Sequence, residues 1–142
     1  MRRLLSCLSY LWAAPATALG LLTTLLALSL GARARLIDGV LEVSGGRWEG
    51  VLGRLPRAIG VEAITLGHVV LGRNPRGLAQ WRLHERVHVR QYERWGVLFF
   101  PLYLGSSVWQ WLRGRDPYRD NHFEVEAFRA EAPRIKPRSR AP

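Results

Sequence analysis

The chain has 142 residues, a single cysteine and a formal net charge of +10 at pH 7. This length suits one domain, and one cysteine excludes both an intrachain disulfide and a zinc site built from cysteines. The positive charge comes almost wholly from arginines that are spread along the chain beside long apolar stretches, a pattern that favours membrane lipids over nucleic acid as a partner.

The N-terminal segment is apolar, and residues 4–31 carry no charged side chain. As a helix they would be about 42 Å long, against about 30 Å for the hydrocarbon core of a bilayer. We therefore predict a membrane anchor over residues 1–35, with Pro15 as the place for a kink. A signal peptide cleaved at an Ala-Arg-Ala sequence (32–34) is the alternative, although the apolar run is long for one. Arginines on both sides leave the orientation open.

A small β-sheet is predicted next. Residues 36–43 and 48–52 flank a Ser-Gly-Gly-Arg sequence (44–47), which is typical of a hairpin. Residues 61–71 are rich in β-branched and apolar side chains and predict a further strand. Gly67 interrupts that strand, which indicates a bulge or the close approach of another backbone.

The most informative pattern is His-Glu-x-x-His at residues 84–88, inside a predicted helix over residues 78–95. On a helix, His84 and His88 lie one turn apart on the same face. Both imidazoles can then bind one zinc ion, while Glu85 reaches a water on that ion as general base. This face also carries aromatic side chains, whereas four arginines follow the opposite face at i, i+4 spacing. The motif is therefore predicted to face the interior.

Two more helical segments follow the motif. A second apolar run covers residues 96–112, and a last helix is predicted over residues 121–131, with Asp120 or Asn121 as its N-cap. The folded domain would cover residues 36–132. The basic, proline-bearing segment 133–142 has no apolar pattern and is predicted to be a disordered tail.

The last helix offers a third zinc ligand. Residues 124–127 read Glu-Val-Glu-Ala, which has the form Glu-x-x-Ala. With the His-Glu-x-x-His helix, this segment resembles the gluzincin superfamily of zinc metallopeptidases, and most closely the membrane-bound CAAX-protease and heat-shock membrane protease group. The resemblance implies zinc as the cofactor, Glu85 as the catalytic base and, as the metal ligands, His84, His88 and Glu124. Glu126 is the alternative third ligand.

One position departs from that family's pattern. Phe128 stands where the family has an aspartate that orients a ligand histidine. The candidates for supplying this carboxylate are Asp116, Asp120 and Glu131. The candidate donors to an oxyanion are His68, Tyr103 and Tyr118. A histidine packed in a strand, as His68 is predicted to be, more often has a structural role.

The two motifs together constrain the second apolar run. His88 precedes this run and Glu124 follows it, yet zinc ligands must all lie about 2 Å from one ion. The run therefore cannot cross a bilayer once between them. It should instead be a re-entrant or surface-lying hairpin that bends near Pro101 or Gly105, or a pair of core helices.

These patterns predict an α+β protein. Its order is an N-terminal membrane helix, a small β-sheet, the His-Glu-x-x-His helix, an apolar helical hairpin and a glutamate-bearing helix, a minimal gluzincin-like layout. The expected function is zinc-dependent hydrolysis of a peptide or protein substrate at a membrane surface. The alternative is a non-catalytic, membrane-anchored binding or scaffold protein that keeps the metallopeptidase frame, which Phe128 and the small size favour.

Overall fold

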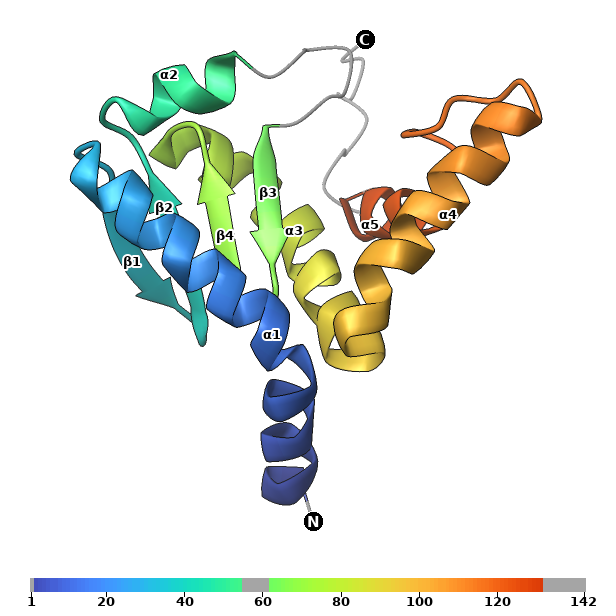
Figure 1. Ribbon diagram of the computed structural model, residues 1–142, viewed down its shortest axis with the longest axis horizontal. Coiled ribbons are helices and arrows are strands. Elements are labelled where there is room, and N and C mark those ends of the chain that lie inside the picture. The colour runs from blue at the N-terminus through green and yellow to red at the C-terminus, as the bar shows by residue number, and fades with distance from the viewer. Residues whose placement is uncertain (1, 55–61, 132–142) are drawn as a thin grey trace, which may run out of the picture.

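The computed structural model describes residues 2–54 and 62–131, which form an α+β fold with helices on both faces of a small sheet (Figure 1). The predicted order of elements is confirmed: a long apolar N-terminal helix, the sheet, the His-Glu-x-x-His helix, an apolar helical segment and a glutamate-bearing helix. The tail predicted over residues 133–142 lies outside the described residues.

The sheet is mixed, with the strand order β1-β2-β4-β3. Its strands are β1 (Arg33–Ile37), β2 (Val40–Ser44), β3 (Ala63–Leu66) and β4 (Val69–Gly72). β1 pairs with β2, and β3 with β4, in antiparallel register, and the two hairpins join through parallel pairing of β2 with β4. β3 is therefore an edge strand, and it lies beside the helix that carries the histidine motif.

Helices cover both faces of the sheet. They are α1 (Arg2–Ser29), α2 (Trp48–Gly53), α3 (Pro75–Trp95), α4 (Phe99–Leu112) and α5 (His122–Glu131), with a short 3-10 helix η2 (Gly96–Leu98) between α3 and α4. Figure 1 shows α1 in front of the sheet and α3 behind it. Because successive side chains of a strand point to opposite faces, Val69 and Leu71 of β4 share a core with Ala27 of α1, whereas Val70 packs with α3 residues.

Small residues line the side of α1 that packs on the sheet. Its buried positions are Ala13, Gly20, Thr24 and Ala27. A Cβ atom on Gly67, in the turn between β3 and β4, would lie 2.6 Å from the backbone nitrogen of Thr17, so the two backbones approach closely, as predicted. Pro15 lies inside α1, and Figure 1 shows this helix changing direction part way along its length.

The other side of α1 is apolar and uncovered. The stretch Tyr10–Ser29 is long and apolar enough to cross a membrane, and only 22% of its apolar window is buried. The exposed side chains include Leu11, Leu19, Leu22, Leu25 and Leu26. The helix continues directly into the domain, because Ala32 is buried in the core and β1 begins at Arg33. Residues 33–35, predicted to belong to the anchor, are therefore part of the sheet.

The hairpin predicted around residues 44–47 is wrong. β1 and β2 turn instead at Asp38-Gly39, whose φ angles of 48° and 77° are both positive, as a two-residue type I′ turn requires. Trp48 and Leu52 are not in a strand: they lie one turn apart on α2, and both are buried in the core with Ala27. An i, i+4 apolar pair therefore marks a short helix here.

The strand predicted over residues 61–71 is two strands in the described part of the chain. β3 and β4 form a hairpin that turns at Gly67, whose φ is 61°. A glycine at the first central position is typical of a type II′ turn, which suits a two-residue hairpin connection. The interruption seen in the sequence is thus a complete reversal of the chain.

α3 begins and packs as its sequence predicts. The Asn74 side chain accepts a hydrogen bond of 2.8 Å from a backbone N–H three residues on, and Pro75 occupies the first helical position. Among the arginines on the outer face, Arg82 and Arg86 bind the buried Glu42 of β2, whereas Arg90 and Arg94 are exposed. The arginine face is therefore solvated only in its second half.

The chain reverses at the end of α3, and not near Pro101 or Gly105 as predicted. Gly96 has a φ of 56°, and a Cβ atom there would lie 2.5 Å from the indole nitrogen of Trp12. Only glycine suits this corner. α4 then runs through Pro101 without interruption. Pro101 lies in the first turn, where its missing N–H removes no intrahelical hydrogen bond.

We predict that Gly67→Ala destabilises the protein by about 1–3 kcal/mol, because the new Cβ needs an unfavourable φ and meets the α1 backbone. Gly50→Ala is the matched control: Gly50 lies in α2, where an added Cβ atom would meet nothing within 4 Å, and alanine is the better helix former. Thermal unfolding of detergent-solubilised protein measures both. Equal midpoints for the two variants would contradict the tight contact between α1 and the sheet.

Candidate metal centre

α3 supplies the first three side chains of the site. His84, Glu85 and His88 are buried, with exposed fractions of 3%, 7% and 7%. They lie on the side of α3 away from the exposed Arg90 and Arg94, as the helical spacing predicts. The motif therefore faces the interior.

α5 supplies the fourth side chain of the site, Glu124. Of the two predicted N-caps, Asn121 is the one observed, and its side-chain oxygen accepts a 2.9 Å hydrogen bond from the Phe123 N–H. The Asn121 amide also donates to the backbone oxygen of Tyr103 and to Ser107 Oγ on α4, so that α4 fixes where α5 begins. A short way further along α5, Glu124 is only 3% exposed.

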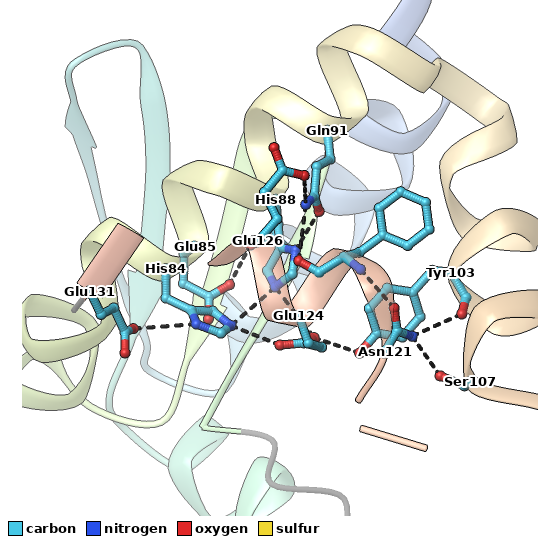
Figure 2. A network of polar contacts seen from close by, with 12 residues as sticks. His84, Glu85, His88, Gln91, Tyr103, Ser107, Asn121, Glu124, Glu126 and Glu131 are labelled. Atoms are coloured by element: carbon cyan, nitrogen blue, oxygen red, sulfur yellow. Dashed lines mark hydrogen bonds and ion pairs between the residues drawn. The ribbon is translucent and has the colours of Figure 1, made fainter. Parts of the chain in front are cut away.

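His84, His88 and Glu124 point toward one another (Figure 2). The two histidine Nε2 atoms lie 3.1 Å apart. Glu124 Oε2 lies 3.0 Å from His84 Nε2, and Glu124 Oε1 lies 3.4 Å from His88 Nε2. One ligand atom from each residue falls within 4.8 Å of the others, so these three buried side chains lie close enough to hold one metal ion.

Gln91 determines which nitrogen of His88 faces the cluster. The Gln91 amide nitrogen donates to Phe123 O at 3.0 Å and to Glu126 Oε2 at 2.9 Å, so its amide oxygen must be the atom 2.8 Å from His88 Nδ1. That oxygen can only accept, which places a proton on Nδ1. The lone pair of His88 Nε2 is then directed at the cluster, as a metal ligand requires.

The donor atoms fit a cation. Glu124 Oε2 is buried and has no hydrogen-bond donor among the described residues. His84 Nε2 lies at contact distance from this oxygen, but the contact lacks hydrogen-bond geometry. A buried carboxylate oxygen without a partner costs free energy, and a bound cation would remove that cost. The same cation would separate the two Nε2 lone pairs. Two imidazoles and a carboxylate are the protein ligands of many catalytic zinc sites.

The pKa shifts in the cluster also favour a bound cation. Burial opposes ionisation of Glu124, but its interactions with His84, His88 and Tyr103 outweigh burial and lower its pKa to about 2. Burial likewise opposes protonation of His88, but Glu124 and Glu85 outweigh it and raise its pKa. The site therefore holds a negative carboxylate against imidazoles in an environment that favours positive charge.

Glu131 brings a carboxylate beside the histidine that the aspartate expected at position 128 would orient. Glu131 Oε1 lies 3.3 Å from His84 Nδ1, on the side of the ring away from Glu124. Phe128 instead packs its ring against His84, with 4.9 Å between ring centroids. Of the three acidic candidates, Glu131 is thus the one that the structure places beside a histidine of the cluster. His88 Nδ1 is hydrogen-bonded to the Gln91 amide oxygen, whereas the contact of His84 Nδ1 with Glu131 lacks hydrogen-bond geometry.

Glu85 points into the same site from α3. Its Oε2 accepts a 2.6 Å hydrogen bond from Thr65 Oγ1 on β3, so the edge strand positions this carboxylate. Thr65 and Gln91 are site residues that the sequence motifs do not include. Gln91 carries a detectable signal, because it is a polar side chain on the buried face one turn after His88. Thr65 carries none, because a strand residue gives no sign of the helix side chain that it will meet.

A pocket of about 260 Å³ opens on the cluster. Its walls come from β3, α3 and α4, and the residues that line it include Ile64, Thr65, Glu85, Phe99, Phe100, Tyr103 and Tyr118. A larger hollow of about 540 Å³ lies between β1 and the start of α3, but it holds none of the clustered residues, so we assign the chemistry to the smaller one. The pocket beside these three residues is otherwise largely apolar.

Two tyrosines in this pocket remain protonated at neutral pH. Burial and the charge of Glu124 raise the pKa of both Tyr103 and Tyr118 above its usual value. Tyr103 donates a 2.6 Å hydrogen bond to Glu124 Oε1. Tyr118 also lines the pocket near Glu124, so two of the three predicted oxyanion donors, Tyr103 and Tyr118, lie beside the cluster.

Two predicted residues do not reach the site. His68 stacks on Tyr10 at 4.0 Å between ring centroids, and its ring nitrogens contact Thr17 and Glu93, away from the clustered residues. Asp120 is exposed and accepts a hydrogen bond from the Asp116 N–H within its own loop. The structure therefore places neither side chain among the clustered residues, because position in a predicted strand and proximity in sequence do not reveal local partners.

Glu126, the alternative third ligand, lies outside the cluster. It is exposed, and its carboxylate accepts the hydrogen bond from Gln91. The helical spacing that places Glu124 with Ala127 on the buried side of α5 turns Glu126 away.

Comparison with known proteins finds no match among family models, curated proteins or solved structures. The assignment of the site therefore depends on its own geometry.

We predict that the protein binds one zinc ion per chain and that Glu124→Gln removes most of it, whereas Glu126→Gln retains it. The reason is that only Glu124 lies within reach of both histidines. Elemental analysis of purified protein after zinc loading and dialysis measures the content of each variant. Greater loss in Glu126→Gln than in Glu124→Gln would overturn the assignment of the third ligand.

We also predict that Gln91→Leu weakens zinc affinity by about 10- to 100-fold, because His88 loses the oxygen that holds its tautomer. Competition with a chromophoric chelator measures the affinity. Glu126→Gln is again the control, because its amide oxygen can still accept from Gln91. Unchanged affinity in Gln91→Leu, with unchanged thermal stability, would show that Gln91 does not orient a ligand.

Proposed function

We propose that the protein is a zinc-dependent peptidase that acts at a membrane surface. The observation that carries this proposal is the convergence of buried His84, His88 and Glu124 next to Glu85, at the base of one pocket. Metal ligands alone would suit a structural site. A carboxylate that points into the same pocket and is not part of the cluster is what a hydrolytic site adds.

Zinc is the metal that this set of ligands favours, since it accepts two imidazoles and a carboxylate and keeps a further position open. When bound, zinc would lower the pKa of a coordinated water and polarise a carbonyl group. Glu85 is placed to accept a proton in the pocket. Among the described residues, Thr65 occupies its Oε2, which leaves Oε1 for that proton. Tyr118 can donate its hydroxyl proton to a developing oxyanion.

The peptide bond as substrate is inferred from the resemblance to the gluzincin metallopeptidases, in which the same residue types occupy this order along the chain. The apolar pocket is consistent with an apolar side chain beside the scissile bond. The membrane location is supported by α1, whose outward side is rich in exposed leucines. A cleaved signal peptide is the less favoured role for α1, because cleavage would remove Ala27 from the core.

Catalysis is tested most simply at Glu85. We predict that Glu85→Gln lowers the rate of peptide cleavage by about 100- to 10,000-fold while zinc stays bound, because Glu85 is a base and not a ligand. Glu49→Gln is the control, since Glu49 is an exposed glutamate on α2. The assay uses detergent-solubilised, zinc-loaded protein and a peptide library, with zinc content measured on the same samples.

The same assay distinguishes the alternative function. A non-catalytic binding or scaffold protein with this frame would bind zinc but cleave nothing. Equal background cleavage by wild type and Glu85→Gln, with one zinc on each, would remove the peptidase proposal and leave the scaffold.

A further inference from the structure

α4 turns its polar side toward the protein and its apolar side outward, which is the reverse of a helix on a water-soluble domain. Its polar side chains Ser106, Ser107 and Gln110 are half-buried and face the protein, where Asn121 binds Ser107 and the His122 N–H binds Ser106. The outward residues are apolar: Phe100, Leu102, Leu104, Val108, Trp109, Trp111 and Leu112. A helix on the surface of a water-soluble domain shows the opposite arrangement.

The outward side of α4 is also large. Val108, Trp109, Trp111 and Leu112 are 53%, 57%, 66% and 67% exposed, and Phe99 is the one buried residue of α4. So many exposed tryptophan and leucine side chains on one short helix are typical of a surface that contacts an apolar partner.

The ends of α4 show how a membrane could provide that partner. The helix has 14 residues and is therefore about 21 Å long, too short to cross a hydrocarbon core of about 30 Å. Its first end joins α3, and α5 after its second end packs back on α3 through Glu124 and His84. Both ends therefore lie on the same side of any bilayer.

Charge at the second end favours lipid over another protein. The loop after α4 carries the exposed arginines Arg113, Arg115 and Arg119, whereas its two aspartates, Asp116 and Asp120, accept hydrogen bonds from backbone N–H groups of the loop. The Arg113 guanidinium lies over the Trp109 ring, 5.4 Å from its centroid. Tryptophan beside arginine at the end of an apolar helix is typical of the boundary between acyl chains and anionic headgroups.

We propose that α4 is a membrane-contact helix that lies in the interface of an anionic bilayer, with its outward side in the acyl region and Arg113, Arg115 and Arg119 among the lipid phosphates. Such helices sink about 5–10 Å below the headgroups. α4 would then be a second attachment to the membrane, distinct from α1. The proposal shares only the membrane location with the proposed function and needs neither zinc nor catalysis.

Spin-label accessibility tests this placement. Single cysteines are introduced in a Cys7→Ser background at three outward positions of α4, as Leu104→Cys, Val108→Cys and Leu112→Cys. Leu22→Cys reports on the exposed side of α1, and Arg90→Cys reports on the exposed arginine face of α3. Full-length labelled protein is reconstituted in vesicles of phosphatidylcholine and phosphatidylglycerol in equal parts. Collisions with oxygen, which concentrates in lipid, are compared with collisions with a water-soluble nickel chelate.

The expected result is a ratio of oxygen to nickel collisions that is several-fold higher at all three α4 positions than at Arg90→Cys. A ratio on α4 equal to that at Arg90→Cys would place α4 in water and overturn the proposal. Low collision rates with both reagents would indicate a protein interface, such as a second copy, and would also overturn it. If Leu22→Cys reports lipid while α4 reports water, attachment through α1 stands and the α4 proposal alone fails. Circular dichroism of each labelled variant verifies folding.

Discussion

The burial of the Glu124 carboxylate between two histidines is the constraint on which the rest of the structure depends. Removing a carboxylate from water costs free energy unless charge and hydrogen bonds replace the lost solvent. Here the Tyr103 hydroxyl of α4 donates to one carboxylate oxygen, and a cation held with His84 and His88 of α3 would supply the remaining charge. α5 must therefore pack against α3 at one register, and α4 must supply Tyr103 from the third side. The packing of α3, α4 and α5 and the geometry of the site therefore depend on the same interactions.

The helical parts of the fold are predictable because their apolar periodicity is long and their ends carry strong signals. α3 has an Asn-Pro start and a glycine stop, and its two faces differ clearly in composition. The β hairpins are not predictable in the same way, because two sequences within a few residues of each other both have the composition of a turn. Gly45-Gly46 has the composition of a turn, but Asp38-Gly39 fits a type I′ turn better and is where the chain reverses. A prediction that places the turn at Gly45-Gly46 must also assign residues 48–52 to a strand, although they form a helix.

The candidate site is predictable to the extent that one helix defines it. Helical spacing places His84, Glu85 and His88 on one buried face and separates Glu124 from Glu126. The surrounding partners depend on contacts between elements, which spacing along the chain does not contain. Thr65 meets Glu85 across the edge of the sheet, and Glu131, one turn beyond the position of the expected aspartate on α5, lies beside His84. His68 is misplaced for the same reason, since its partners come from α1 and α3.

The central claim is that His84, His88 and Glu124 form a metal centre, and zinc K-edge X-ray absorption of the zinc-loaded protein tests it most directly. The account predicts two imidazole nitrogens at about 2.0–2.1 Å, shown by the multiple scattering of histidine rings, and oxygen ligands at about 2.0–2.2 Å. Substitution of His84→Ala should reduce the imidazole contribution or remove the zinc. Zinc without imidazole scattering, a sulfur shell from the single cysteine, or failure to bind zinc at all would contradict the claim.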